Sequence, residues 1–399
     1  MNPVKSEYSI EDLEQFRDEH GFIDLSKAGI KFTIESREIE GNPYRDKNWV
    51  NFAGKKALIK GEAKIDDESN YGIYAELIVE EISKYFGRDT AHYDLIKYKD
   101  ENGQEVRGVL SESVIDLENE QLVTLRDLIG DEPEEDTKYP DTTSLDFTII
   151  GLTKKLTEDG YEKKDIQNLM TEYKKDLLFY SIYLLDVDKH VENIGFVKKK
   201  VAGKDVIELS KNYDSEAALM LDYNISTIKE ILEGDISGLK ISVEEAHPRI
   251  GSYKTVEDGG IGSYWMDTLE ELCDDDEIYD YYTMLQKAEL DMDVILERVE
   301  KRIGAELPKD VKHIAKYSHM VRTEDMEKVM NGEIEIIQVQ GTDIDPDKYL
   351  KMIINATLQK ETRTGEQVSI GQKMEKDMKA PQSDLTDMLN KLFQGEGRG

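Results

Sequence analysis

The chain has one cysteine, Cys273, in 399 residues, which excludes an internal disulfide framework and favours a reducing compartment. No apolar run approaches the roughly 20 residues that a membrane-spanning helix needs. The N-terminal stretch Met1–Glu7 also lacks the apolar region of a signal peptide. The sequence is therefore expected to belong to a cytoplasmic protein that does not interact with membranes.

Basic side chains are scarce as well. The chain carries 52 lysines and arginines against 86 aspartates and glutamates, which gives a formal net charge of −34 and a pI near 4.6. Such a charge argues against direct binding to nucleic acid or to an anionic membrane, because phosphates would be repelled. It is compatible with simple solubility and leaves room for a basic protein partner.

Residues 30–115 carry the hydrophobic pattern of a small antiparallel sheet with one helix. Apolar side chains recur at helical spacing from Tyr74 to Phe86, and Gly87 follows as a stop signal. Gly54-Lys55 and Asn102-Gly103 are typical of hairpin turns. The strands are expected at residues 31–37, 49–53, 56–60, 91–98 and 105–111.

Beyond residue 115 the pattern becomes mainly helical. A polar loop at 131–142 precedes an apolar stripe that runs from Ile166 to Leu184, and a hairpin is expected across Ala202-Gly203. A further helix is predicted from Met292 to Ile303. The stretch after residue 333 is polar, apart from an amphipathic pattern at 383–393 that would suit packing on the protein itself or on a partner.

This order of elements predicts an α+β protein with the two lobes of a protein kinase. The small sheet with its helix would be the N-lobe, and the helical part would be the C-lobe. The predicted divisions are an N-terminal extension with a short helix near 10–19, the two lobes, and a C-terminal extension that is partly disordered or binds a partner. Their boundaries are 1–29, 30–115, 116–332 and 333–399.

The stretch Leu185–Phe196 carries the most informative motif. It reads D-x-H-x-x-N through Asp188, His190 and Asn193, and Asp214 follows a hairpin later. Phosphoryl transfer needs one carboxylate aimed at the attacking hydroxyl, and a second carboxylate with an amide oxygen to hold Mg²⁺. Asp188 is the candidate catalytic carboxylate, Asn193 and Asp214 are candidate metal ligands, and His190 is expected to brace the loop. The plain alternative is a turn after a helix, which Asp and Asn also favour.

Two further charged residues fit the same chemistry. Lys60 ends the third predicted strand and could reach the phosphates of a nucleotide, while Glu76 in the first turn of the next helix could hold that lysine in place. Each has an ordinary alternative: a solvated lysine at a strand end, and a glutamate that is favoured by the helix dipole.

Four segments, in the expected order, resemble the HipA-like serine/threonine protein kinases, and the resemblance covers roughly residues 30–305. They are the catalytic-loop run Asp188–Phe196, the helix Tyr74–Gly87, the inter-lobe segment Gly108–Ser111 and the metal-binding segment Asn212–Asp214. The resemblance implies ATP and Mg²⁺ as cofactors and a protein substrate. Because many family members are bacterial toxins, it also implies a regulatory or antitoxin protein.

The chain departs from that family pattern where nucleotide phosphates would be held. Residues 40–47 contain one glycine, so a glycine-rich loop is missing there, and Arg45 or Lys47 are the candidate replacements. Glu112 and Ser113, after the inter-lobe segment, are further candidates for the nucleotide site. Lipid kinases also use D-x-H-x-x-N. A small-molecule or lipid kinase, or a non-catalytic pseudokinase that acts as an acidic interaction module, therefore stays an alternative.

Overall fold

The computed structural model describes residues 4–30, 47–62, 64–65, 68–100, 102–130, 144–223, 225–233, 265–288 and 290–333. Four features of the sequence lie outside these ranges. They are the strand expected at 31–37, the candidate Arg45, the polar loop at 131–142 and the amphipathic pattern at 383–393.

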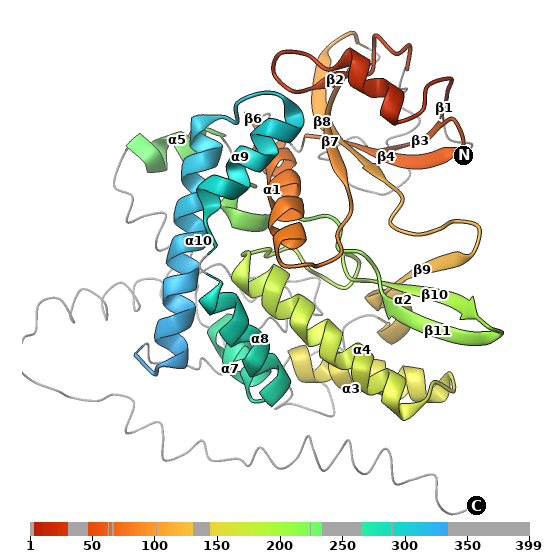
Figure 1. Ribbon diagram of the computed structural model, residues 1–399, viewed down its shortest axis with the longest axis vertical. Coiled ribbons are helices and arrows are strands. Elements are labelled where there is room, and N and C mark those ends of the chain that lie inside the picture. The colour runs from red at the N-terminus through yellow and green to blue at the C-terminus, as the bar shows by residue number, and fades with distance from the viewer. Residues whose placement is uncertain are drawn as a thin grey trace, which may run out of the picture. The chain divides into compact units, whose positions relative to one another are not determined.

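A six-stranded sheet forms the N-lobe, with the strand order β1-β3-β4-β8-β7-β2 (Figure 1). In that order the strands are Val4–Ser6, Lys47–Phe52, Lys55–Gly61, Glu105–Glu112, Tyr93–Lys99 and Ile23–Asp24. The four central strands pair antiparallel, as predicted, whereas β1 and β2 add parallel edges. The residues expected to form an N-terminal extension thus supply both edges of the sheet, together with the 3₁₀ helix η1 (Glu11–Phe16).

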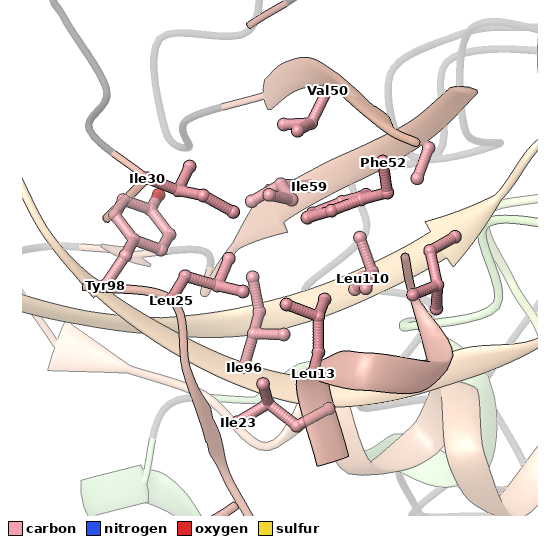
Figure 2. Close-up of a cluster of buried hydrophobic side chains, with 12 residues drawn as sticks. Leu13, Ile23, Leu25, Ile30, Val50, Phe52, Ile59, Ile96, Tyr98 and Leu110 are labelled. Atoms are coloured by element: carbon pink, nitrogen blue, oxygen red, sulfur yellow. The ribbon is translucent and has the colours of Figure 1, made fainter. Parts of the chain in front are cut away.

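One face of this sheet is covered by a cluster of buried apolar side chains (Figure 2). Alternate residues of β3 and β4 point into it, as a strand with one buried face requires. The cluster comprises Ile10, Leu13, Ile23, Leu25, Ile30, Val50, Phe52, Ala57, Ile59, Ile96, Tyr98 and Leu110. A slip by one residue would expose this set, so the cluster fixes the register that places Lys47 opposite Lys60.

Helix α1 (Gly72–Tyr85) is buried on nearly every side because it contacts both β7 and the C-lobe helix α9. Its Glu80 is 1% exposed and lies 2.8 Å from Arg302 and 2.6 Å from His92. Burial alone would raise the pKa of Glu80, but the hydrogen bond from His92 and the charge of Arg302 lower it to about 2. These contacts hold α1 against the strand and the helix on its two sides.

The C-lobe begins with a second, three-stranded sheet in the order β11-β10-β9. The predicted hairpin is present, with Ala202 and Gly203 both at positive φ in its turn. The strands of this sheet are Lys204–Leu209, Gly195–Val201 and Glu120–Thr124. Two short strands, β5 (Lys64–Ile65) and β6 (Glu68–Ser69), pair separately just before α1.

The other regular elements of the C-lobe in the described ranges are helices. They are α2 (Leu125–Ile129), α3 (Ser144–Glu158), α4 (Lys163–Asp176), the π-helix η3 (Leu177–Tyr183), the 3₁₀ helix η4 (Ala218–Met220), α5 (Ile225–Glu233), α7 (Trp265–Cys273), α8 (Asp276–Lys287), α9 (Met292–Ile303) and α10 (Lys309–Met330). Helix α9 matches its predicted bounds. Asp291 caps its start, and Gly304 ends it in the left-handed conformation. Within the ranges given above, no helix is long and apolar enough to cross a bilayer.

His319 on α10 gives the C-lobe a sensitivity to acid. Its ring is 6% exposed and stacks edge-on against Tyr183 at 4.8 Å, and burial lowers its pKa from 6.5 to about 4. His319 therefore binds a proton more tightly in the unfolded chain than in the folded protein. The contribution of this histidine to stability is fully present above pH 6.5 and is lost as pH falls towards 4.

Replacing His319 with leucine is expected to remove that loss. Between pH 7.5 and pH 4 the wild type should lose about 3 kcal/mol more free energy of unfolding than His319→Leu. Urea unfolding of both proteins at several pH values measures this difference in free energy. The contributions of the other titratable groups are common to both proteins and cancel. Parallel stability curves over this range would show that the buried imidazole does not stay neutral.

Candidate active site

Strand β4 and helix α1 bring Lys60 and Glu76 together in the interior. The two side chains are 4% and 1% exposed, and Lys60 Nζ lies 2.6 Å from Glu76 Oε1. The strands can approach closely here because residue 108 of β8 is glycine: a Cβ at that position would collide with the Lys60 carbonyl oxygen. The contact between lysine and glutamate that the sequence predicted is therefore formed.

Lys60 also contacts two acidic residues in the segment that follows the hairpin β10–β11 in the chain. Its Nζ lies 2.7 Å from Asp214 Oδ1 and 3.3 Å from Glu216 Oε2. Glu76, Asp214 and Glu216 each offer a carboxylate oxygen, and these oxygens lie within 4.8 Å of one another. Several clustered carboxylate oxygens are the donors that a hard divalent cation such as Mg²⁺ prefers, so the residues present fit this ion.

Glu216 was not anticipated from the sequence. It stands two residues after Asp214 in the run Asn212-Tyr-Asp-Ser-Glu216. The signal in the sequence that could have identified Glu216 is that a second acidic residue follows Asp214 at a spacing of two.

A second lysine approaches the same carboxylate. Lys47 lies directly opposite Lys60 in the β3–β4 pair, and its Nζ is 3.8 Å from Asp214 Oδ2. Two ammonium groups from neighbouring strands thus converge on Asp214. Lys47, one of the two candidates for replacing a glycine-rich loop, therefore lies beside the same carboxylate as Lys60, and its role towards phosphates stays a prediction.

The catalytic-loop residues follow directly after the π-helix η3, and the loop is organised by hydrogen bonds to the backbone of Asp188. The Asn193 side-chain amide and the His190 backbone N–H both donate to the Asp188 carbonyl oxygen, at 2.8 and 2.9 Å. Since Asn193 donates through Nδ2, its Oδ1 is the atom that could coordinate a metal ion. The Asp188 side chain is 36% exposed and is therefore accessible to an acceptor.

His190 lies in the loop in the manner expected of a bracing residue. Its Nδ1 accepts a hydrogen bond from the Glu192 backbone N–H at 3.2 Å, and its Nε2 lies 4.0 Å from Asp188 Oδ1. An imidazole that accepts through Nδ1 carries its proton on Nε2 when it is neutral, on the side of the catalytic carboxylate. The ring thus contacts the backbone of its own loop, and its role towards Asp188 stays a prediction.

Glu112 and Ser113 lie at the other end of β8. Glu112 Oε1 is 3.9 Å from Lys55 Nζ, and the Ser113 backbone N–H donates to the Lys56 carbonyl at 3.2 Å. In the β4–β8 register Glu112 pairs with Ala57, three positions along the strand from Lys60, which is roughly 10 Å. Their assignment to nucleotide binding stays a prediction.

No protein-family model matches the chain, and no curated protein matches it. Among solved structures, the proinflammatory kinase CtkA of Helicobacter pylori matches with a TM-score of 0.50 and 15% identity, over 77% of this chain and 99% of CtkA. HipA of Shewanella oneidensis, solved as a toxin–antitoxin complex with HipB and operator DNA, matches with a TM-score of 0.40 and 12% identity. That match covers 75% of this chain and 68% of HipA.

At this level of identity the match to the Helicobacter pylori kinase concerns the fold. It shows that the chain has a kinase-like α+β fold, with a sheet-containing N-terminal lobe and a helical C-terminal lobe. The predicted fold class and the predicted likeness to a kinase are thus confirmed at the level of the fold.

Proposed function

We propose that the protein is an ATP- and Mg²⁺-dependent kinase of HipA-like fold that transfers the γ-phosphate to a serine or threonine hydroxyl of a protein. One observation carries the proposal: Lys60, Glu76 and Asp214 come from three separate elements and meet within hydrogen-bond distance inside a kinase-like fold. In phosphoryl transfer the protein contributes mainly position and charge. A buried lysine held by one carboxylate beside a second carboxylate is the arrangement that this chemistry requires.

Each residue then has a defined task. The Lys60 ammonium, held by Glu76, would neutralise nucleotide phosphates, with Lys47 adding charge on the neighbouring strand. Asp214 and the Asn193 amide oxygen would hold Mg²⁺, and Asp188 would orient the acceptor hydroxyl. When bound, ATP and Mg²⁺ supply the phosphoryl group and neutralise the charge that develops as it is transferred.

The net charge of −34 favours a basic segment of a protein as the acceptor. A regulatory or antitoxin protein is part of the same proposal, since the resemblance of the sequence to the HipA-like kinases implies one. A small-molecule or lipid acceptor would use the same site residues, so the acceptor has to be identified by experiment.

The proposal is tested by incubating the protein with γ-labelled ATP and Mg²⁺, alone and with cell lysate. Label on serine or threonine of a protein is the expected result, and chelation of Mg²⁺ should abolish it. Label in a small molecule or lipid alone would move the assignment to that acceptor class. If ATP with Mg²⁺ neither transfers label nor raises the melting temperature, the fold serves as a pseudokinase.

Asp214→Asn is expected to weaken Mg²⁺-dependent ATP binding more than Asn193→Ala does. Asn keeps the shape of Asp and tolerates the left-handed backbone at this position, φ 57°. Loss of the Asp214 charge should weaken the contact with Mg²⁺ more than loss of the Asn193 amide dipole. Two unit charges about 4 Å apart attract by about 4 kcal/mol at an effective dielectric constant of 20, and solvation by water replaces part of that attraction in the variant. The loss should therefore be on the order of 100-fold for Asp214→Asn and smaller for Asn193→Ala.

Calorimetric titration with ATP, with and without Mg²⁺, compares the two variants with the wild type. Binding without Mg²⁺ serves as the internal control, since neither residue contacts the nucleotide in the proposal. An Asp214→Asn protein that binds ATP with Mg²⁺ as the wild type does would place the metal elsewhere.

A further inference from the structure

Lys189, between Asp188 and His190, is a buried lysine to which the roles above give no task. It is 3% exposed, and its Nζ donates to the carbonyl oxygens of Tyr213 at 2.6 Å and of Asp214 at 3.2 Å. Its Nζ also lies 3.1 Å from Asp186 Oδ2. The ammonium thus donates to two backbone carbonyl oxygens, and the Asp186 carboxylate lies beside it as an ion-pair partner. One side chain of the catalytic loop therefore binds the backbone of the metal-binding segment.

Asp214 has a conformation that needs such support. Its φ of 57° lies in the left-handed region, which a residue other than glycine keeps only where the surroundings fix it. From one side, the Asp214 backbone N–H donates to the Tyr93 hydroxyl at 3.0 Å, and the Ser215 N–H donates to Glu76 at 2.9 Å. From the other side, Lys189 of the catalytic loop donates hydrogen bonds to the carbonyl oxygens of Tyr213 and Asp214.

Asp186 keeps the charge of this buried lysine balanced. Its side chain is 0% exposed and belongs to the turn that leads from η3 into the catalytic loop. A buried ammonium without a counter-charge would be strongly disfavoured. The pair thus allows the ammonium to lie against the two carbonyl oxygens, where its hydrogen bonds are charge-assisted.

We propose, on the basis of the function proposed above, that Lys189 is a positioning residue that holds Asp214 in its metal-binding conformation and sets its distance from Asp188. Lys189 is the residue that follows Asp188 in the chain, and its side chain donates a hydrogen bond to the Asp214 carbonyl oxygen. The carboxylate for the acceptor and the carboxylate for the metal are therefore connected through one side chain. Loss of the ammonium should loosen Asp214 and weaken Mg²⁺ binding, although Lys189 touches neither metal nor nucleotide.

The informative variant is Asp186→Asn/Lys189→Met. Lys189→Met alone would leave a fully buried carboxylate without a partner and could prevent folding. The double variant removes both charges and keeps the side-chain lengths. A cavity of about 30 Å³ beside Lys189, Asn193 and Tyr213 leaves space for small adjustments. Asp186→Asn alone keeps the Tyr213 and Asp214 carbonyl oxygens and an amide oxygen as acceptors for the ammonium, and it is the matched comparison once thermal unfolding shows that it folds without the counter-charge.

Lys312→Met serves as the control for loss of a lysine elsewhere, because Lys312 bonds Glu300 at 2.9 Å in the C-lobe. The Mg²⁺ concentration that half-saturates ATP binding is measured for all four proteins by calorimetry. The double variant should need about 10- to 100-fold more Mg²⁺, the usual loss when a group that orients a metal ligand is removed. Asp186→Asn and Lys312→Met should stay within about threefold, and metal-free ATP binding should not change.

Hydrogen exchange of peptides that cover residues 211–217 gives a readout that does not depend on nucleotide. It should be faster in the double variant and unchanged in both comparison proteins. Faster exchange with an unchanged Mg²⁺ requirement would make Lys189 a merely structural residue and would overturn the inference, as would no change in either measurement. If the wild type itself binds no ATP with Mg²⁺, the proposed function fails, and the exchange data alone decide whether Lys189 holds the segment.

Discussion

Replacing Asp188 with asparagine is expected to reduce phosphoryl transfer by roughly 10²- to 10⁴-fold, the usual contribution of a positioned acid–base group. Binding of ATP with Mg²⁺ should persist, because in the proposed mechanism the Asp188 carboxylate acts on the acceptor hydroxyl. The fold around it should also persist. Asn193 and His190 hold Asp188 through its backbone carbonyl, which asparagine retains. Transfer of label from γ-labelled ATP measures the rate, and calorimetry measures the binding.

Glu192 offers a matched control in the same loop. Its side chain is 48% exposed and pairs with Arg126 at 2.7 Å, so Glu192→Gln removes an equal charge without touching the proposed chemistry. Exposed pairs of this kind contribute little to stability. Glu192→Gln should therefore transfer phosphate nearly as fast as the wild type. Equal losses in the two variants would mean that the general negative charge of the loop matters, and an active Asp188→Asn protein would end the assignment.

The sequence predicted those parts of the site that have a local signal. The D-x-H-x-x-N spacing marks the catalytic loop because three functional side chains sit within six residues. The Lys60–Glu76 pair could be inferred because helix α1 begins soon after strand β4 in the chain, with the short strands β5 and β6 between them. The ion pair has the geometry expected. Helix α9 was found with its bounds because its apolar side chains recur at helical spacing and Gly304 is a strong stop signal.

Other parts depend on contacts that leave no local pattern. Strands β1 and β2 have three and two residues, too few for a periodic signal, and they pair parallel with strands far along the chain. The apolar stripe from Ile166 to Leu184 looked like one helix. The structure instead ends α4 at Asp176, and the chain continues as the π-helix η3 before it reaches the catalytic loop.

Lys189 illustrates the same limit within the site. In the sequence it is an ordinary polar residue in a turn, and lysines are almost always exposed. Its partners Tyr213 and Asp214 lie 24 and 25 residues away, so that only the packing of the hairpin β10–β11 brings them together. The sequence names the groups that carry out the chemistry more readily than the groups that hold them in place.

The Lys60–Glu76 pair should behave as one functional unit. Lys60→Met is expected to reduce phosphoryl transfer by roughly 10²- to 10³-fold, the usual loss when one preorganised donor to developing charge is removed. Glu76→Gln should cost less, because it leaves the ammonium in place but releases its orientation. Lys60 has the larger effect since it also contacts Asp214 and Glu216, and in the mechanism it alone reaches the phosphates.

The double variant Lys60→Met/Glu76→Gln separates pairing from independent effects. If Glu76 acts through Lys60, the double variant should be about as active as Lys60→Met, because partners in one interaction are not additive. Lys55→Met, on the same strand but 54% exposed and paired with Glu11, controls for loss of a lysine from β4.

Breaking a buried pair costs about 3–5 kcal/mol, so thermal unfolding must show that each variant is folded at the assay temperature. Losses that multiply would mean that Lys60 and Glu76 act independently. An active Lys60→Met protein would transfer its task to Lys47, whose ammonium already lies 3.8 Å from Asp214.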